Sequence, residues 1–187
     1  MDDALLSLAD LLDCWVSGNP ACDECAYLAG IEDLFLTYIA DLWDLHENGN
    51  IRKGSVPGGA MTVSPDLCDD GMWMPQDGVD TYTAAGDNRI RIDHGTFGSH
   101  SSSAKSIILG AMLMHEREHF DDQFAFDDGV VTPTTAAALD AAECSAATFE
   151  SWILSCYACC VDLDEAAATE LEQRQQALAD FKAAHGC

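Results

Sequence analysis

Apolar residues recur at intervals of three and four near the start of the chain, which is the period of an amphipathic helix. In residues 3–16 the apolar positions form one stripe, made of Leu5, Leu8, Leu12 and Trp15. The segment GNPACDEC then ends the helix, because glycine and proline interrupt helical structure. The same period returns from Asp23 to Glu47. The pattern predicts two helices in residues 1–47, and core packing explains both.

The pattern changes in residues 48–102, where glycine, proline, aspartate and serine are frequent and the apolar runs are short. The segments VDTYTA (Val79–Ala84) and NRIRID (Asn88–Asp93) alternate in the manner of strands, with a glycine-containing turn between them. They predict a short antiparallel hairpin, to which the segment SVPGGAMTV could add a strand.

Helical patterns resume after residue 102. Ser102 or Ser103 can cap a helix that runs through the apolar segment IILGAMLM to Phe120. Thr134 or Thr135 can cap a long alanine-rich helix that ends with CYACC, and an amphipathic helix is predicted over residues 162–185.

No repeat and no low-complexity linker divides the 187 residues. We therefore predict a single domain over residues 1–187. It has a helical N-terminal part (1–47), a part with loops and a small sheet (48–102), and a part with the C-terminal helices (103–187). The predicted fold class is α+β, mainly helical with a small antiparallel sheet.

The chain is very acidic, with 33 Asp and Glu against 8 Lys and Arg and a formal net charge of −25. Such a surface repels phosphates and anionic lipids, so nucleic-acid and membrane partners are not expected. Met1 is followed by Asp2 and Asp3 rather than by a basic and apolar leader, so no secretory signal is predicted. The location is left open between the cytoplasm and export by a signal-independent route, and so is the oligomeric state.

The nine cysteines include two clusters, CDEC at Cys22–Cys25 and CYACC at Cys156–Cys160. Two thiolates from each cluster could hold a structural zinc ion in a tetrahedral site. Disulfides in an oxidising compartment, or buried free thiols in a reducing one, are the alternatives.

The segment HEREH carries the clearest chemical signal. His115 and His119 are four residues apart, so on a helix their imidazoles lie on one face and can bind one cation. Glu116 is rotated off that face and can reach a water molecule beside the cation, where it would act as a general base.

These residues resemble the HExxH motif of the zincin metallopeptidases. The resemblance implies a buried helix that carries the motif, and a zinc ion that activates water for peptide-bond hydrolysis. It also implies an upstream antiparallel sheet with a substrate-binding edge strand, and NRIRID is placed where such a strand would be.

A zincin also needs a third protein ligand. The metzincin pattern is excluded, because Asp122 stands where its glycine should be and Ala125 where its ligand should be. The gluzincin pattern, with a glutamate on the next helix, fits Glu143, which lies 24 residues after His119. Glu150 is the reserve ligand. Asp122 is a weaker one that could instead orient a histidine.

One departure from the family concerns Arg117 and Glu118, because the two residues between the glutamate and the second histidine are usually uncharged. They imply that this part of the helix is partly exposed or internally paired. Tyr157 is a candidate donor to the oxyanion of the transition state, and His94 and His100 are others.

We therefore expect a zinc (Zn²⁺) metallopeptidase of the gluzincin type. His115, His119 and Glu143 would bind the metal, Glu116 would be the base, and the substrate would be a protein or peptide, which the acidic surface suggests is basic. The alternative is an acidic interaction protein without enzymatic activity, such as a nucleic-acid mimic or inhibitor, with a structural zinc site.

Overall fold

The computed structural model describes residues 1–16, 25–53, 90–92, 102–122 and 133–187. They form the elements α1 (Asp2–Val16), α2 (Ala26–Ala29), α3 (Glu32–Glu47), β1 (Ile51–Lys53), β2 (Ile90–Ile92), α6 (Ser102–Asp122), α7 (Pro133–Cys160) and α8 (Glu165–His185). Every described helix is too short or too polar to span a lipid bilayer.

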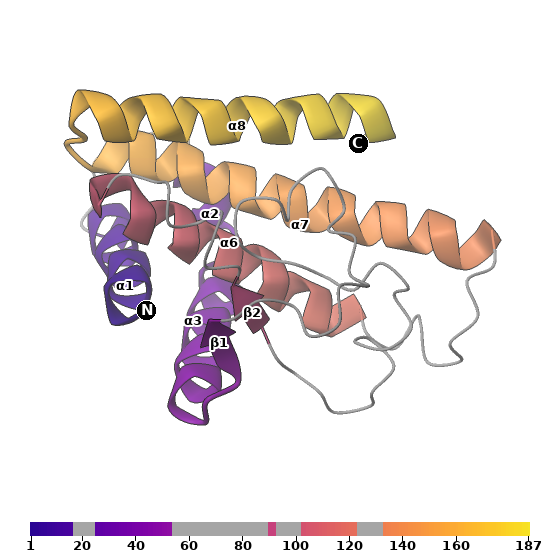
Figure 1. Ribbon diagram of the computed structural model, residues 1–187, viewed down its shortest axis with the longest axis horizontal. Helices are drawn as coiled ribbons and strands as arrows, with labels where there is room; N and C mark the ends of the chain where they lie inside the picture. The colour runs from indigo at the N-terminus through magenta and orange to yellow at the C-terminus, as the bar shows by residue number, and fades with distance from the viewer. Residues whose placement is uncertain (17–24, 54–89, 93–101, 123–132) are drawn as a thin grey trace.

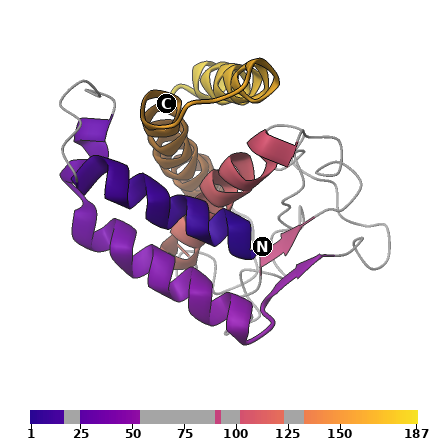
Figure 2. The same ribbon diagram turned by 90° about the vertical axis from the view of Figure 1, so that its left-hand side faces the viewer.

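Helix α6 lies at the centre of the described helices. It packs most extensively against α7 and also contacts α1, α3 and α8. Helices α7 and α8 run side by side along the length of the molecule (Figure 1), and α1 and α3 lie next to each other (Figure 2). Because α6 is covered from several directions, both its faces must be apolar.

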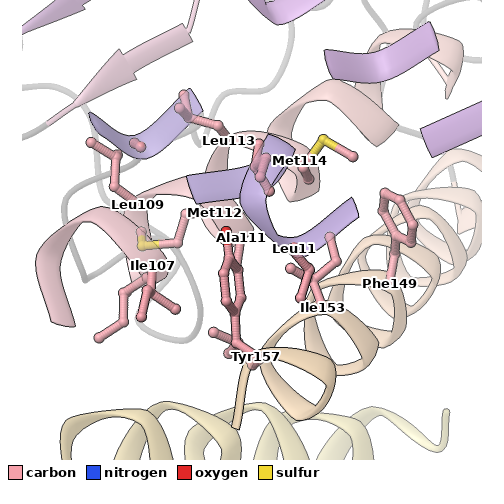
Figure 3. Close-up of a cluster of buried hydrophobic side chains, with 14 of the residues drawn as sticks. Leu11, Ile107, Leu109, Ala111, Met112, Leu113, Met114, Phe149, Ile153 and Tyr157 are labelled. Carbon is pink, nitrogen blue, oxygen red and sulfur yellow. The ribbon is translucent and has the colours of Figure 1, made fainter. Parts of the chain in front are cut away.

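The sequence of α6 meets this requirement. All residues from Ile107 to Glu116 are buried, and the apolar side chains of the segment 107–114 form one cluster with Leu11 of α1 and with Ile153 and Tyr157 of α7 (Figure 3). Gly110 allows the close approach of α1, because a Cβ atom there would lie 3.0 Å from the carbonyl oxygen of Ala4. The apolar segment 107–114 is therefore the centre of the core.

The predicted antiparallel sheet is wrong, and with it the α+β fold class. The described residues are almost entirely helical, and the two short strands pair in parallel, with Ile51 opposite Ile90 and Lys53 opposite Ile92. The buried Ile51 and Ile90 bring the strands together, and the long connection between them permits the parallel direction. The segments VDTYTA and SVPGGAMTV lie outside the described residues.

The helical class is consistent with the structure, but two helix boundaries differ from the prediction. The predicted helix 23–47 is divided, because Gly30 ends α2 and α3 begins at Glu32. The last helix begins at Glu165 rather than at residue 162, because the Asp164 carboxylate caps it by accepting a hydrogen bond from the Ala167 backbone N–H at 2.8 Å.

Disulfide bonds tie the ends of the chain to α7. They join Cys14 to Cys160, Cys25 to Cys156, and Cys144 to Cys187. Cys159 is also disulfide-bonded. Of the alternatives left open for the two cysteine clusters, the structure contains the disulfides.

Candidate metal centre

His115 lies in the interface between helices α6 and α7. It follows the buried apolar segment of α6, and its 2% exposure leaves it almost inaccessible to solvent. Its imidazole faces α7, which carries Glu143 and Glu150 seven residues apart and therefore on one face of that helix. Packing of α6 against α7 thus brings a histidine to two carboxylates.

The two carboxylates contact opposite nitrogen atoms of the imidazole. Oε2 of Glu143 lies 3.6 Å from Nε2 of His115, and Oε2 of Glu150 lies 2.9 Å from Nδ1. Zinc bonds to nitrogen and oxygen of about 2.0–2.2 Å place two tetrahedral ligand atoms about 3.3–3.5 Å apart. The separation of Nε2 and the Glu143 oxygen is close to that value, so both atoms can bind one ion.

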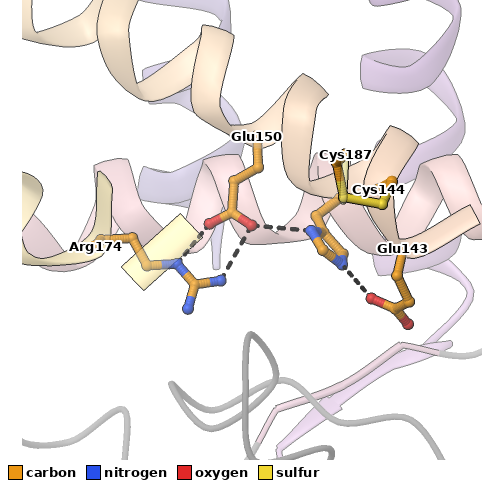
Figure 4. A network of polar contacts seen from close by, with 6 residues as sticks. Glu143, Cys144, Glu150, Arg174 and Cys187 are labelled. Atoms are coloured by element: carbon orange, nitrogen blue, oxygen red, sulfur yellow. Dashed lines mark hydrogen bonds and ion pairs between the residues drawn. A yellow bond between two sulfur atoms is a disulfide. The ribbon is translucent and has the colours of Figure 1, made fainter. Parts of the chain in front are cut away.

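The sequence suggested Glu150 as a reserve metal ligand, but the structure places it on the other side of the imidazole from Glu143. The Glu150 carboxylate is fully buried and contacts both the imidazole of His115 and Arg174 of α8, and Figure 4 shows the pair with Arg174. The Arg174 guanidinium donates to both carboxylate oxygens, from Nε at 2.7 Å and from Nη2 at 3.0 Å. Glu150 therefore orients His115 from the side away from Nε2, as carboxylates behind metal-binding histidines do.

The charges of this cluster shift the pKa values of its members. Burial alone would lower the pKa of His115, but the adjacent carboxylates of Glu143 and Glu150 favour the protonated imidazole more strongly and raise the pKa to about 10. Burial would raise the pKa of Glu150, but the Arg174 charge and the His115 contacts lower it to about 2. Without a metal, the cluster therefore holds a proton on His115 at neutral pH.

The other motif residues follow on the same helix. Glu116 is 7% exposed and adjoins His115. The backbone of His119 lies in α6 one turn further on, so it shares a face with His115. The side chains of His119 and Asp122 lie outside the described residues.

The two charged residues inside the motif are internally paired, which is one of the two explanations that the sequence left open. Arg117 donates to Asp41 of α3 from Nε at 2.9 Å and lies 4.4 Å from the centroid of the Tyr38 ring. The carboxylate of Glu118 accepts hydrogen bonds from Tyr38 at 2.8 Å and from Ser145 of α7 at 2.9 Å. These contacts attach the motif helix to its neighbours.

The structure does not bring Tyr157 to this site. It lies 14 residues after Glu143 on α7, which is about 21 Å along the helix axis. Its buried hydroxyl donates to Ser7 at 2.9 Å beside a cavity of about 390 Å³, and burial raises its pKa. The predicted oxyanion role of Tyr157 is therefore not retained, and His94 and His100 lie outside the described residues.

Sequence reasoning missed Arg174, which completes the cluster. One signal was available: Arg174 shares the inward stripe of α8 with Leu171, Leu178 and Phe181, and a buried arginine requires a carboxylate partner. No protein-family model, curated protein or solved structure matches this chain. What the chain does must therefore be inferred from its own residues.

Proposed function

We propose that the chain is a zinc-dependent peptidase in which His115, His119 and Glu143 bind the metal and Glu116 is the general base. The observation that supports it best is the pairing of His115 Nε2 with the Glu143 carboxylate at 3.6 Å across two helices. Glu150 holds the other imidazole nitrogen, so Nε2 is directed towards Glu143.

The charge of the cluster fits a bound cation. With His115 neutral, the charges of Glu143, Glu150 and Arg174 sum to −1 among these side chains, and the Glu143 side chain is 18% exposed. Such a charge attracts a cation to the side of His115 that faces Glu143, whether a proton on the imidazole or a metal ion. Imidazole nitrogen and carboxylate oxygen are ligands that zinc accepts.

The chemistry divides between the metal and Glu116. Zinc would supply a Lewis acid that polarises the peptide carbonyl and lowers the pKa of water to about 7. Glu116 would take the proton from the attacking water and pass it to the leaving amine, since a general base must lie next to the reacting water. The net charge of −25 favours a basic peptide as substrate.

The test replaces Glu116 by glutamine, with Glu118→Gln as the matched control in the same motif. Zinc content is measured by mass spectrometry of the metal, and hydrolysis with peptide mixtures rich in lysine and arginine. Glu116→Gln should retain zinc and lose about 10²–10⁴-fold in rate, which is the usual contribution of a general base. Glu118→Gln should retain both properties.

Two outcomes contradict the proposal. Full activity of the Glu116→Gln variant would overturn the role of Glu116. A wild-type protein that binds no zinc at neutral pH would overturn the metal site.

The acidic composition supports a second candidate function, that of an interaction protein with a structural zinc site that binds a basic partner. The two functions differ in metal coordination, because structural zinc has four protein ligands whereas catalytic zinc keeps a position for water. X-ray absorption spectroscopy of the zinc-loaded protein distinguishes them.

A further inference from the structure

Four cysteine sulfurs gather at the C-terminal end of α7, where Cys156 and Cys160 lie about 9–15 Å along the helix axis from Glu150. They belong to two disulfides, Cys14–Cys160 and Cys25–Cys156, yet Sγ of Cys25 lies only 3.7 Å from Sγ of Cys160. The sulfurs of Cys25, Cys156 and Cys160 all lie within 4.8 Å of one another.

The spacing suits a zinc ion. Zinc–sulfur bonds of about 2.3 Å in a tetrahedron place neighbouring sulfurs about 3.8 Å apart. The Cys25–Cys160 pair already has this separation. The Cα atoms of the disulfide-bonded pairs are 6.1 Å and 4.7 Å apart, so after reduction all four thiols start within reach of one centre.

The surroundings would keep the thiols together after reduction. Cys25 and Cys156 are buried in the core, and the apolar residues Leu11, Leu28 and Ile153 anchor α1, α2 and α7 independently of the disulfides. A buried thiol does not readily lose its proton unless a positive charge is near. A zinc ion supplies that charge. The helices thus hold three of the four sulfurs within 4.8 Å of one another, and Cys14 is brought to them by its bond to Cys160.

We propose that Cys14, Cys25, Cys156 and Cys160 form a tetrathiolate zinc site when the two disulfides are reduced. Each disulfide takes two electrons and two protons from a dithiol, which becomes a disulfide itself. The four thiols then release protons as they bind Zn²⁺. The same three helices are thereby joined by a covalent crosslink in oxidising surroundings and by a metal in reducing ones.

The test titrates the full chain with Co²⁺, with and without prior reduction by a phosphine, which becomes the phosphine oxide by taking oxygen from water. Thiolate ligands give cobalt a near-ultraviolet charge-transfer band that imidazole and carboxylate ligands do not give. The reduced chain should show this band at one equivalent of Co²⁺, and the oxidised chain should not. Failure of the His115 site would not change this band, so the two proposals are tested separately.

Variants identify the ligands. Cys14→Ser and Cys160→Ser should each weaken cobalt binding by at least about 100-fold, the upper end of what loss of a supporting residue causes. Cys144→Ser removes a thiol about 18 Å along α7 from Cys156 and should leave the band unchanged. A band that survives in Cys14→Ser but is lost in Cys159→Ser would overturn the proposed ligand set.

A second measurement needs no variant, so misfolding of a mutant cannot obscure the result. Reduced wild-type protein is alkylated with iodoacetamide, and the modified cysteines are located by peptide mass spectrometry. Free zinc at 100 times the dissociation constant should slow modification of the four cysteines about 100-fold. Cys144 and Cys187 should react at the same rate with and without zinc. If zinc slows all six cysteines equally, or none of them, the site is refuted.

Discussion

Arg174 is the residue whose removal should reveal most about the candidate centre. Replacing it with methionine retains much of the side-chain volume but removes both hydrogen bonds to Glu150. The Glu150 carboxylate, 0% exposed, would then keep His115 as its only charge partner among the residues that the structure describes. Removing one partner of a buried ion pair costs about 3–5 kcal/mol, because the other charge stays desolvated.

The free energy of unfolding is measured by urea denaturation with a chelator present, so that metal binding does not contribute. The midpoint of thermal unfolding should fall by roughly 6–20 °C for a chain of this size. Arg117→Met is the matched control, because its partner Asp41 is 41% exposed. An ion pair of that kind contributes at most about 1 kcal/mol, and the contact with Tyr38 about 1 more. If Arg174→Met costs no more than Arg117→Met, the buried charge network is not as described.

Three further predictions concern the same helices. Glu143→Ala should abolish zinc binding, whereas Glu150→Ala should weaken it by about 10–100-fold, as loss of a supporting carboxylate does. Competition with a chromogenic chelator measures both affinities. Equal losses in the two variants would contradict their different roles. In the metal-free protein, the pKa of His115 rises from 6.5 to about 10 on folding, so its stabilising effect is complete below pH 6.5 and is lost as the pH rises towards 10. The difference in unfolding free energy between wild type and His115→Gln should therefore shrink over that range, and a constant difference would disprove it. Gly110→Ala should destabilise the protein by about 1–3 kcal/mol despite the better helix propensity of alanine, because the new Cβ would lie 3.0 Å from the carbonyl oxygen of Ala4 in α1. A rise in the thermal midpoint would contradict this prediction and show that α1 can move away.

The helices were the predictable part of the fold. Their apolar spacing is a local property, so the segments that became α1, α6 and α7 were found within a few residues of their ends. The strand pairing was not predictable, because β1 has only three residues and its partner lies far along the sequence. A pattern of alternation in NRIRID indicates a strand but does not indicate which segment pairs with it, or in which direction.

The candidate site divides in the same way. The spacing of the motif and the position of Glu143 in an alanine-rich segment suggested the pair that the structure places 3.6 Å apart. The different role of Glu150 depends on how α7 is rotated against α6, and the part played by Arg174 depends on where α8 packs. The apolar period of a single helix predicts neither how α7 is rotated against α6 nor where α8 packs. The roles of Glu150 and Arg174 therefore became visible only in the tertiary structure.

The single helix α7 carries both Glu143 and Cys160, so it fixes the distance and the relative rotation of the His115 cluster and the cysteine cluster. One residue inserted between Glu150 and Cys156 would turn everything beyond it by about 100°. The cysteines would then face away from α1 and α2 while the carboxylates stayed in place. Insertions in the connections between helices are compatible with this fold. An insertion between Glu150 and Cys156 is not, because it would rotate the cysteine cluster away from the helices that it contacts.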